Sequence, residues 1–525
     1  MKRWFLLSAL FVASLTAAVA QDGDDAGDKI PAGKVQPRLI RGPYLQVATT
    51  HSIAIRWRTD ALIRGRVHYG SSVDRLDKVA DDSTLTTEHI VKIDGLQPET
   101  KYFYSIGSFK ASLQGDSGNY FVTLPPAGKK GFYRIGVFGD CGNNSTNQRN
   151  VHQAMLNYLG NNYLNAWILL GDNCYSDGTD AEFQAKFFNI YKDDLLKKYP
   201  LFPAPGNHDY HDIESSAEVA QRTHTIAYYQ NFSMPEEGEA GGAPSHTKAF
   251  YSYDIGNVHF LSLDSYGKEE NMYRMYDTAG PQVQWVKRDL EANVNKQWIV
   301  AYWHHPPYTM GSHSSDNSGE LKLIRENFIR ILERYGVDLI LCGHSHDYER
   351  SKLMEGYYGM EADFSPKYYL STSSGKYDGS PNSCPYIKDS TDRGTVYVVS
   401  GSAGQLGGKQ PSWPHDALPF ADATNGGSCI LEVDANRLDL KWICGDGVIR
   451  DRFTMMKEVN KRIVLHARKG EAVTLTASYA GDYKWKGQAS VARSIEVRPG
   501  VGVTLYSVGD PNGCLKDVFE VHVER

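Results

Sequence analysis

The sequence predicts three folded units in series: an all-β sandwich, a central α/β domain and a C-terminal all-β domain. A chain of 525 residues is too long for one hydrophobic core. Short alternating strands separated by turns dominate residues 38–126 and 460–525. Between them, over residues 131–456, apolar strands alternate with segments that have the apolar spacing of amphipathic helices. These three observations predict the multidomain fold class.

Residues 1–20 have the layout of a secretory signal peptide. Lys2 and Arg3 form a charged start, an apolar stretch follows, and residues 18–20 form a small-x-small cleavage site. A membrane anchor is the alternative, which the short apolar stretch disfavours. No later segment is long and apolar enough to cross a membrane. We therefore expect a secreted protein, either periplasmic, at the cell surface or extracellular, with residues 21–37 as a flexible lead-in.

Net charge and cysteine content limit the partners. A formal net charge of -6 argues against a nucleic acid as a stable partner. The seven cysteines are an odd number, so at least one is unpaired or pairs between chains. Cys429 and Cys444 flank a predicted hairpin, which makes a cross-strand disulfide possible. Cys141 and Cys174 either pack beneath polar loops or pair with each other. Disulfide connectivity and oligomeric state are not predictable from the sequence.

The N-terminal unit, residues 38–126, contains two features of a particular sandwich. Residues 52–57 alternate apolar and polar side chains and end in Trp57, which we expect to be buried. Residues 95–104 run through Gly, Pro and several tyrosines, with Tyr102 at the corner position. The segment resembles the tyrosine corner of a fibronectin type III-like domain.

The central domain alternates strands with helices. Strands are predicted over residues 134–138, 166–170, 298–303, 337–341 and 396–399, and helices over residues 148–164, 281–292 and 321–335. Two further strands, 430–433 and 438–443, have the pattern of an antiparallel hairpin. The irregular segment 355–428 is interpreted mainly as loops near the rim of a site.

The C-terminal unit, residues 460–525, also shows strand alternation. Trp485 and Cys514 resemble an immunoglobulin-like core. The first cysteine of such a core is missing, because Val473 and Leu475 occupy the positions where it would lie. Cys514 therefore has no predicted partner within this unit.

Polar groups follow five strand-like runs of the central domain, each beside glycine or proline. The clusters are residues 139–142, 171–175, 206–209, 304–308 and 343–346. Each cluster alone has an ordinary structural explanation, such as a Gly-Asp turn or a packed aromatic ring. Together they would require five coincidences, all at strand ends of one domain. Because functional groups in open α/β sheets gather where strands end, we expect these clusters to meet.

The residue types indicate a metal site. Aspartate, asparagine and histidine suit borderline to hard metal ions. Seven such groups, tyrosine included, are too many for one tetrahedral ion and suit two ions that share a carboxylate.

The five clusters resemble the metallophosphoesterase superfamily in order and in detail, over roughly residues 131–456. Tyr175, in the pattern Gly171-Asp172-x-x-Tyr175, narrows the resemblance to purple acid phosphatases, many of which carry an N-terminal fibronectin-like domain. The resemblance implies a central β-sandwich flanked by helices and a cofactor of Fe(III) plus a divalent Fe, Zn or Mn.

The resemblance also implies roles for individual residues. The Fe(III) ligands would be Asp140, Asp172, Tyr175 and His346. Asp172 would bridge to the divalent ion, whose other ligands would be Asn207, His304 and His344. In the family's His-x-Pro pattern, His305 stands at the x position. Residues two apart on a strand point to opposite faces, so His344 and His346 can reach different ions only if the turn at Gly343 leaves strand geometry.

The implied reaction is that of an acid phosphatase, a hydrolase in which metal-bound hydroxide attacks a phosphate monoester in line with the leaving group. His208 and His313 would contact substrate and supply the leaving-group proton, and Asn173 would contact the phosphate. The family often has two adjacent histidines at this point, whereas here Ser314 follows His313. The residues that would orient the ligands are Asp209, Glu349 and Arg350.

Two alternatives remain open. One is a phosphodiesterase or nucleotide-cleaving enzyme on the same centre. The other is a surface binding protein in which the sandwiches act and the centre is vestigial. The intact set of seven ligands argues against the second alternative.

Overall fold

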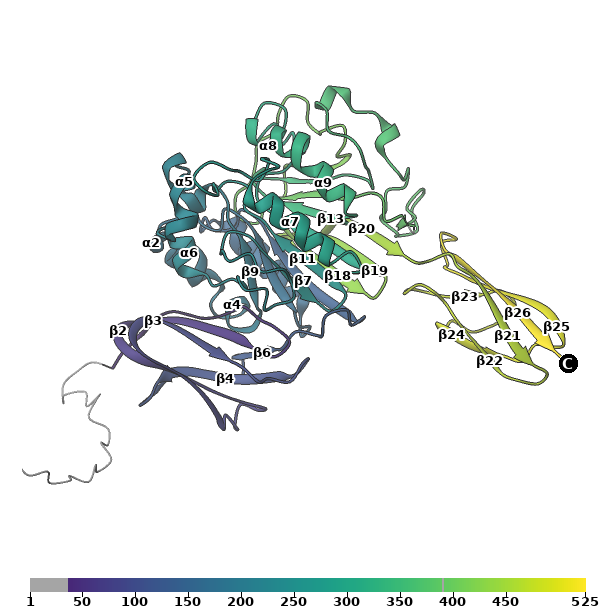
Figure 1. Cartoon of the computed structure of the whole chain (residues 1–525), viewed down its shortest axis with the longest axis horizontal. Helices are drawn as coiled ribbons and strands as arrows, with labels where there is room; N and C mark the ends of the chain where they lie inside the picture. Colours follow the sequence, from purple (N-terminus) through teal and green to yellow (C-terminus); the bar gives the residue numbers. More distant parts are fainter. Residues whose placement is uncertain (1–35, 390) are drawn as a thin grey trace, which may run out of the picture.

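The computed structural model describes residues 36–389 and 391–525, which form three units along the chain (Figure 1). The predicted signal peptide and residues 21–35 of the lead-in lie outside the described residues. Among the helices that are described, none is long and apolar enough to cross a membrane.

The N-terminal unit is all β. Its strands are β1 (Leu39–Gln46), β2 (Ile53–Gly70), β3 (Lys78–Ile93), β4 (Lys101–Ser108), β5 (Ser112–Gln114) and β6 (Tyr120–Val122). The long strand β2 pairs with β1, β3 and β4. Trp57 is buried as predicted, and the Tyr102 hydroxyl accepts the backbone N–H of Gln97 at 3.0 Å. That hydrogen bond is the contact of a tyrosine corner, while the fibronectin type III assignment stays a prediction.

Buried polar contacts join the N-terminal unit to the central domain. The Arg41 guanidinium donates to Oε1 of Gln184 at 2.7 Å and pairs with Asp180 at 2.9 Å. The Tyr104 hydroxyl donates to the Lys197 carbonyl at 2.8 Å. These contacts fix the N-terminal unit beneath the helical side of the central domain in the view of Figure 1.

The central domain contains two seven-stranded sheets. One has the order β10 (Tyr251–Ile255), β11 (Val258–Ser262), β12 (Trp298–Tyr302), β13 (Leu339–Cys342), β16 (Val396–Ser400), β14 (Tyr348–Arg350), β17 (Phe420–Asp422). The other has the order β15 (Tyr386–Lys388), β20 (Ile449–Lys457), β19 (Arg437–Cys444), β18 (Gly427–Asp434), β7 (Phe132–Phe138), β8 (Ala166–Leu170), β9 (Leu201–Ala204). The runs β7-β8-β9 and β11-β12-β13-β16 are parallel.

The two sheets pack face to face and helices flank them, as the resemblance implied. Phe202 on β9 stacks on Tyr253 of β10 with ring centroids 3.9 Å apart, and the Tyr302 hydroxyl donates to the Phe202 carbonyl at 3.1 Å. The helices are α1 (Thr146–Leu159), α2 (Asp180–Glu182), α3 (Asn189–Tyr191), α4 (Leu195–Lys198), α5 (Glu214–Thr223), α6 (Ala227–Asn231), α7 (Pro281–Ala292), α8 (Gly319–Leu323) and α9 (Ile329–Arg334), with π-helical turns η1 (Phe183–Phe188) and η3 (Ile324–Phe328).

The predicted helices differ from the observed ones mainly at their ends. The helix predicted over 281–292 is confirmed as α7. The helix predicted over 148–164 starts at Thr146, where Ser145 caps it, and stops before Gly160, which has φ 53°. The helix predicted over 321–335 contains the π-helical turn η3.

The hairpin predicted near residue 435 is confirmed as β18–β19, but its cysteines do not pair. Cys429 lies opposite Trp442, and Cys444 lies opposite Gly427. Both thiols are free and buried, as are those of Cys141 and Cys174. The two cysteines are thus offset by two residues in the strand register, which explains why the cross-strand disulfide does not form.

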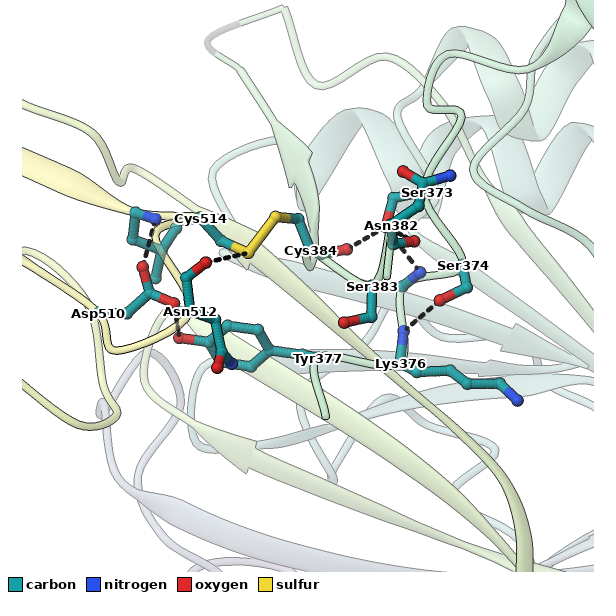
Figure 2. The surroundings of a disulfide bond; sticks show 12 residues. Ser373, Ser374, Lys376, Tyr377, Asn382, Ser383, Cys384, Asp510, Asn512 and Cys514 are labelled. Atoms are coloured by element: carbon teal, nitrogen blue, oxygen red, sulfur yellow. Dashed lines mark hydrogen bonds between the residues drawn. A yellow bond between two sulfur atoms is a disulfide. The ribbon is translucent and has the colours of Figure 1, made fainter. Parts of the chain in front are cut away.

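The C-terminal unit contains the strands β21 (Arg462–Arg468), β22 (Val473–Thr476), β23 (Lys484–Trp485), β24 (Ser494–Val497), β25 (Gly502–Gly509) and β26 (Lys516–Glu524). They form a four-stranded and a two-stranded sheet, and the immunoglobulin-like assignment stays a prediction. Cys514 forms a disulfide with Cys384 of the central domain, 130 residues away (Figure 2). Beside it, the Tyr377 hydroxyl donates to Asp510 at 3.1 Å.

Candidate metal centre

The five polar clusters lie at the carboxyl ends of five parallel strands. The clusters follow β7, β8, β9, β12 and β13 in turn. The ligand atoms of Asp140, Asp172 and His304 lie within 4.8 Å of one another, although they come from three different strand ends. The expectation that these strand ends meet is therefore confirmed.

One group of side chains surrounds Asp140. The Tyr175 hydroxyl donates to Oδ1 of Asp140 at 2.8 Å, and Nε2 of His346 lies 3.7 Å from the same oxygen. The backbone N–H of His344 donates to Oδ2 at 2.9 Å. The carboxylate is fully buried, so a cation there would be held away from bulk water.

A second group surrounds Asp172. Nε2 of His304 lies 3.2 Å from Oδ2 of Asp172, and Nδ1 of His344 lies 3.3 Å from that histidine nitrogen. The backbone N–H of His208 donates to Oδ1 of Asp172 at 2.9 Å. The two imidazoles of the His344-x-His346 pair thus face different groups, the first towards His304 and the second towards Asp140.

The backbone leaves strand geometry at three of these positions. Asp140, Asp172 and His344 have φ of 57°, 48° and 69°, a region that non-glycine residues seldom occupy. Residues in such strained conformations persist only where the surrounding structure holds them, and they cluster at functional sites. At His344 the left-handed turn confirms that the segment bends after Gly343 and separates the two imidazoles.

Two glycines permit the close approach of these loops. A Cβ on Gly343 would lie 2.4 Å from Oδ2 of Asp140. A Cβ on Gly206 would lie 2.3 Å from Oδ1 of Asp172. Any side chain at either position would push on a carboxylate of the centre.

The site concentrates buried ionisable groups. Burial, followed by the repulsion of Asp172, raises the pKa of Asp140 well above its usual range. Burial would also raise the pKa of Asp172, but the charge of His304 lowers it overall. Burial opposes protonation of His304, yet Asp172 and Asp140 raise its pKa to about 9. The carboxylates of Asp140 and Asp172 repel each other at this distance, and a bound metal ion would offset that repulsion.

The donor atoms fit metal ions. Oδ1 of Asn207 is buried and lacks a hydrogen-bond partner among the described residues. Nδ1 of His304 lies 2.9 Å from the Leu170 carbonyl, so Nδ1 carries a proton, and Nε2, which faces Asp172, is the nitrogen at which a metal ion would replace a proton. An orphaned amide oxygen and an oriented imidazole are what a metal-binding site requires.

Asp209 supports the centre, and one predicted substrate contact is corrected. Asp209 accepts the N–H of Gly206 at 2.8 Å and Nδ2 of Asn173 at 2.9 Å. Burial raises the pKa of Asp209 to about 8. Asn173 is fully buried and also donates to the Ala204 carbonyl, so its amide faces the protein interior and does not reach the cavity. The predicted contact of Asn173 with phosphate is therefore wrong.

Residues behind the centre also hold its loops. Gln405 and Gly407 donate backbone N–H groups to the carbonyls of Asp140 and His346 at 3.0 and 2.9 Å. They belong to the irregular segment 355–428, which confirms the expected loops near the site. Glu349 accepts the Thr309 hydroxyl, while Arg350 pairs with Asp451 at 2.6 Å in the interior, farther from the ligands than predicted.

A cavity of about 440 Å³ opens above the centre. Its lining residues are Asp172, Asn207, His208, Asp212, Glu214, Tyr266, His305, His313, Ser318, Glu320, His344 and His346. His208 and His313, the predicted catalytic residues, both line it. Sequence reasoning did not identify Asp212, Glu214, Tyr266, Ser318 and Glu320. Tyr266 follows a sixth parallel strand, β11, so strand-end reasoning would have found it had that strand been recognised.

Two parts of the chain match known protein families. Residues 133–348 match the family described as calcineurin-like phosphoesterase. Residues 40–123 match the family described as purple acid phosphatase, N-terminal domain. The second match covers the unit that the sequence predicted as fibronectin type III-like.

Individual proteins agree with these matches. The chain is 30% identical over 290 residues to purple acid phosphatase 23 of Arabidopsis thaliana, covering 51% of this chain and 58% of that protein. It is 26% identical over 401 residues to acid phosphatase type 7 of Mus musculus, covering 70% of this chain and 78% of that protein. The fold resembles that of purple acid phosphatase PPD1 from yellow lupin, with a TM-score of 0.60, 18% identity and coverage of 81% and 74% of the two chains.

The match to the Arabidopsis protein spans little more than half of that protein's length. The two family matches coincide with two observed units, the N-terminal unit and the central domain. The strand ends of the central domain carry the convergent side chains. The chain thus carries a calcineurin-like phosphoesterase domain preceded by a domain that matches the purple acid phosphatase N-terminal domain, and in both it resembles purple acid phosphatases.

Proposed function

We propose that this protein is an exported acid phosphatase that hydrolyses phosphate monoesters at a dinuclear metal centre. One observation carries the proposal: seven potential ligands from five strand ends converge at the base of one cavity. A vestigial centre would have lost members of that set. The names of the related proteins support the same reaction.

The proposed Fe(III) ligands are Asp140, Asp172, Tyr175 and His346, the group around Asp140 together with the bridging carboxylate. The proposed ligands of a divalent Fe, Zn or Mn ion are Asp172, Asn207, His304 and His344. When bound, the two cations would neutralise the phosphate oxygens and lower the pKa of a water molecule.

Two histidines at the cavity wall act on the substrate in this proposal. Nδ1 of His208 lies 2.6 Å from the Ser176 carbonyl, so Nδ1 carries a proton and Nε2 is directed towards Asp172, 3.9 Å away. His313 stacks on His344 with ring centroids 3.9 Å apart. We propose that His208 and His313 hold phosphate oxygens and that one of them donates the proton that the leaving oxygen requires.

Export is supported by the covalent link between two units. The disulfide of Cys384 and Cys514 is stable in oxidising compartments and rare in the cytosol. The sequence prediction of a secreted protein rests on residues 1–20, outside the described residues.

The test compares p-nitrophenyl phosphate with its bis ester across acid and neutral pH, using the full chain loaded with iron and zinc. We expect hydrolysis of the monoester, most rapid at acid pH, and little of the diester. His304→Ala should abolish activity and release metal, while the exposed control His246→Ala should change neither. Hydrolysis of the diester alone, or an iron-loaded protein without monoesterase activity, would overturn the proposal.

A further inference from the structure

A histidine outside the predicted ligand set lies in the same cavity. His305 is 4% exposed and its ring centroid lies 4.3 Å from that of His344. The ring also stacks against that of Tyr266, with centroids 5.9 Å apart. Two residues that line the cavity therefore pack against the His305 ring.

Ser265 contacts His305 through one oxygen. The backbone N–H of His305 donates to Oγ of Ser265 at 3.1 Å, and the same oxygen lies 2.8 Å from Nδ1 of the ring. Ser265 is fully buried, and its hydroxyl has no other partner among the described residues. The hydroxyl proton is therefore satisfied only if it is donated to Nδ1, because Nδ1 is the one acceptor within reach among the described residues. The remaining ring proton must then lie on Nε2.

This tautomer decides what His305 can do. The ligand atoms of His304, His305 and His344 lie within 4.8 Å of one another, so residue types alone would suggest a three-histidine metal site. A metal binds the lone pair of a ring nitrogen, and a protonated Nε2 has none to offer. With Nδ1 turned to Ser265, Nε2–H is the free hydrogen-bond donor of a side chain that lines the cavity.

The residue after His313 does not provide such a donor. Ser314 is buried, and its hydroxyl accepts the N–H groups of Asp316 and Asn317 at 3.3 and 3.2 Å. The side chain closes a turn and is not part of the cavity lining. The second imidazole on the His313 side of the cavity therefore comes from the His304-His305 pair.

We propose that His305 is a further substrate-contacting residue, whose Nε2–H donates a hydrogen bond to a phosphoryl oxygen, and that Ser265 is the positioning residue that fixes its tautomer. This inference rests on the proposed function for the identity of the ligand. It extends that function by adding a fixed hydrogen-bond donor to the phosphate subsite, in a place where the sequence pattern assigned no role.

The tautomer can be measured without any catalysis. The full chain, loaded with diamagnetic zinc and labelled with 15N-histidine, is examined by long-range 1H–15N correlation, with His305→Gln used for assignment. We expect a protonated Nε2 and an unprotonated Nδ1 at His305, and loss of this single state in Ser265→Ala. The control is Ser402→Ala, which removes a buried hydroxyl that lacks a partner. A protonated Nδ1, or a zinc-bound Nε2, would overturn the assignment.

Phosphate affinity tests the contact itself. Titration calorimetry of inorganic phosphate into the zinc-loaded chain should show that His305→Ala lowers the phosphate affinity by ~10-fold or more, because one hydrogen-bond donor to the anion is lost. His305→Gln should recover part of the affinity, because its amide also donates, and both variants should keep the wild-type zinc content. The control His415→Gln changes a buried histidine outside the cavity lining and should bind normally.

Unchanged phosphate affinity in His305→Ala, or loss of a zinc ion, would contradict the proposed contact. The outcome is separable from the proposed function. A chain that binds zinc and phosphate through His305 but fails to hydrolyse monoesters would refute the phosphatase and leave this contact standing.

Discussion

The hydroxyl of Tyr175 donates a 2.8 Å hydrogen bond to Oδ1 of Asp140, although the two residues follow different strands, β8 and β7. Burial and the charge of Asp140 raise the pKa of the Tyr175 phenol well above its usual value. The phenol therefore keeps its proton unless a strong cation takes its place. The hydrogen bond thus marks two oxygens that a trivalent ion could bind together.

Tyr175→Phe should bleach the visible absorption of the iron-loaded protein, because the band would arise from tyrosinate bound to Fe(III). The aromatic ring is retained, so its packing against His208, at 4.7 Å between ring centroids, should persist. Tyr251→Phe removes a buried hydroxyl that bonds the Pro203 carbonyl and serves as the control. An unchanged spectrum in Tyr175→Phe would remove this residue from the ligand set.

Gly343→Ala should disrupt the metal centre without unfolding the domain. The added Cβ would approach Oδ2 of Asp140 to 2.4 Å, and the carboxylate would have to move. We expect fewer metal ions per chain by elemental analysis and an activity loss of ~10–100-fold, as for the loss of a group that orients a metal ligand. Gly500→Ala, where the Cβ meets open space and the backbone is not left-handed, controls for the loss of a glycine. Full metal content in Gly343→Ala would refute this steric argument.

Arg325→Met should lower activity while leaving the metal content unchanged. The buried Arg325 guanidinium donates to the Pro307 and Ser315 carbonyls at 3.3 and 3.0 Å, at the two ends of the loop that carries His313. Freed from these bonds, the loop would no longer hold the imidazole in the cavity, and we expect kcat to fall by ~10-fold or more. Arg330→Met, an exposed change nearby, should have no such effect. If metal is lost in parallel with kcat, the loop is not the cause.

His259 makes stability depend on pH. Its Nδ1 and Nε2 lie 2.9 and 2.7 Å from the carboxylates of Asp254 and Asp289, and all three residues are buried. Burial alone would lower the pKa of His259, but the two carboxylates raise it. A raised pKa means that the folded chain holds this proton more tightly than the unfolded chain. The resulting stability is fully present below the ordinary histidine pKa of about 6.5 and is lost as the pH rises through the folded value.

Urea unfolding of the wild type and His259→Gln measures this effect. Near pH 6 the variant should be destabilised by about 3–5 kcal/mol, because the buried carboxylate of Asp289 loses its positive partner, while Asp254 keeps its ion pair with Lys296. The difference between the two proteins should shrink towards alkaline pH. A difference that stays constant with pH would show that His259 does not titrate in the way the geometry predicts.

Removing the disulfide should loosen the C-terminal unit and spare the metal centre. The bond closes a loop of 130 residues between the central and C-terminal units (Figure 2). Loss of such a cross-link typically lowers the free energy of unfolding by about 2–4 kcal/mol. Cys384→Ser with Cys514→Ser should therefore unfold at lower urea concentration and be cleaved faster by protease near residue 460, with unchanged kcat. Cys444→Ser, at a free buried thiol, is the control. Equal protease resistance would argue against a role for the bond in docking.

The strand ends of the centre were predictable because parallel strands buried on both faces are continuous apolar runs. β8 and β13 have this pattern, and the glycines after them mark where polar groups converge. Strand β11 was missed because His259 interrupts its apolar run with a buried charge. Without β11, neither Tyr266 nor Ser265 could be assigned to the site.

Other details depend on contacts between distant segments. The orientation of the Asn173 side chain depends on Asp209, which follows a different strand and accepts a hydrogen bond from the Asn173 amide. The partner of Cys514 is 130 residues away in another unit, beyond the reach of local pattern. A departure from strand geometry at Gly343 was predictable from the demand that two imidazoles separate, but the left-handed conformation of His344, with φ 69°, required the structure.

Metal stoichiometry tests the central claim most directly. Elemental analysis of the purified full chain, after loading with iron and zinc and removal of free metal, counts the ions that the seven side chains retain. The account predicts two ions per chain for the wild type, one of them iron, and fewer for Asp172→Ala, whose carboxylate is shared by both proposed ligand sets. A wild-type chain that retains one ion or none, or an Asp172→Ala variant that still retains two, would contradict it.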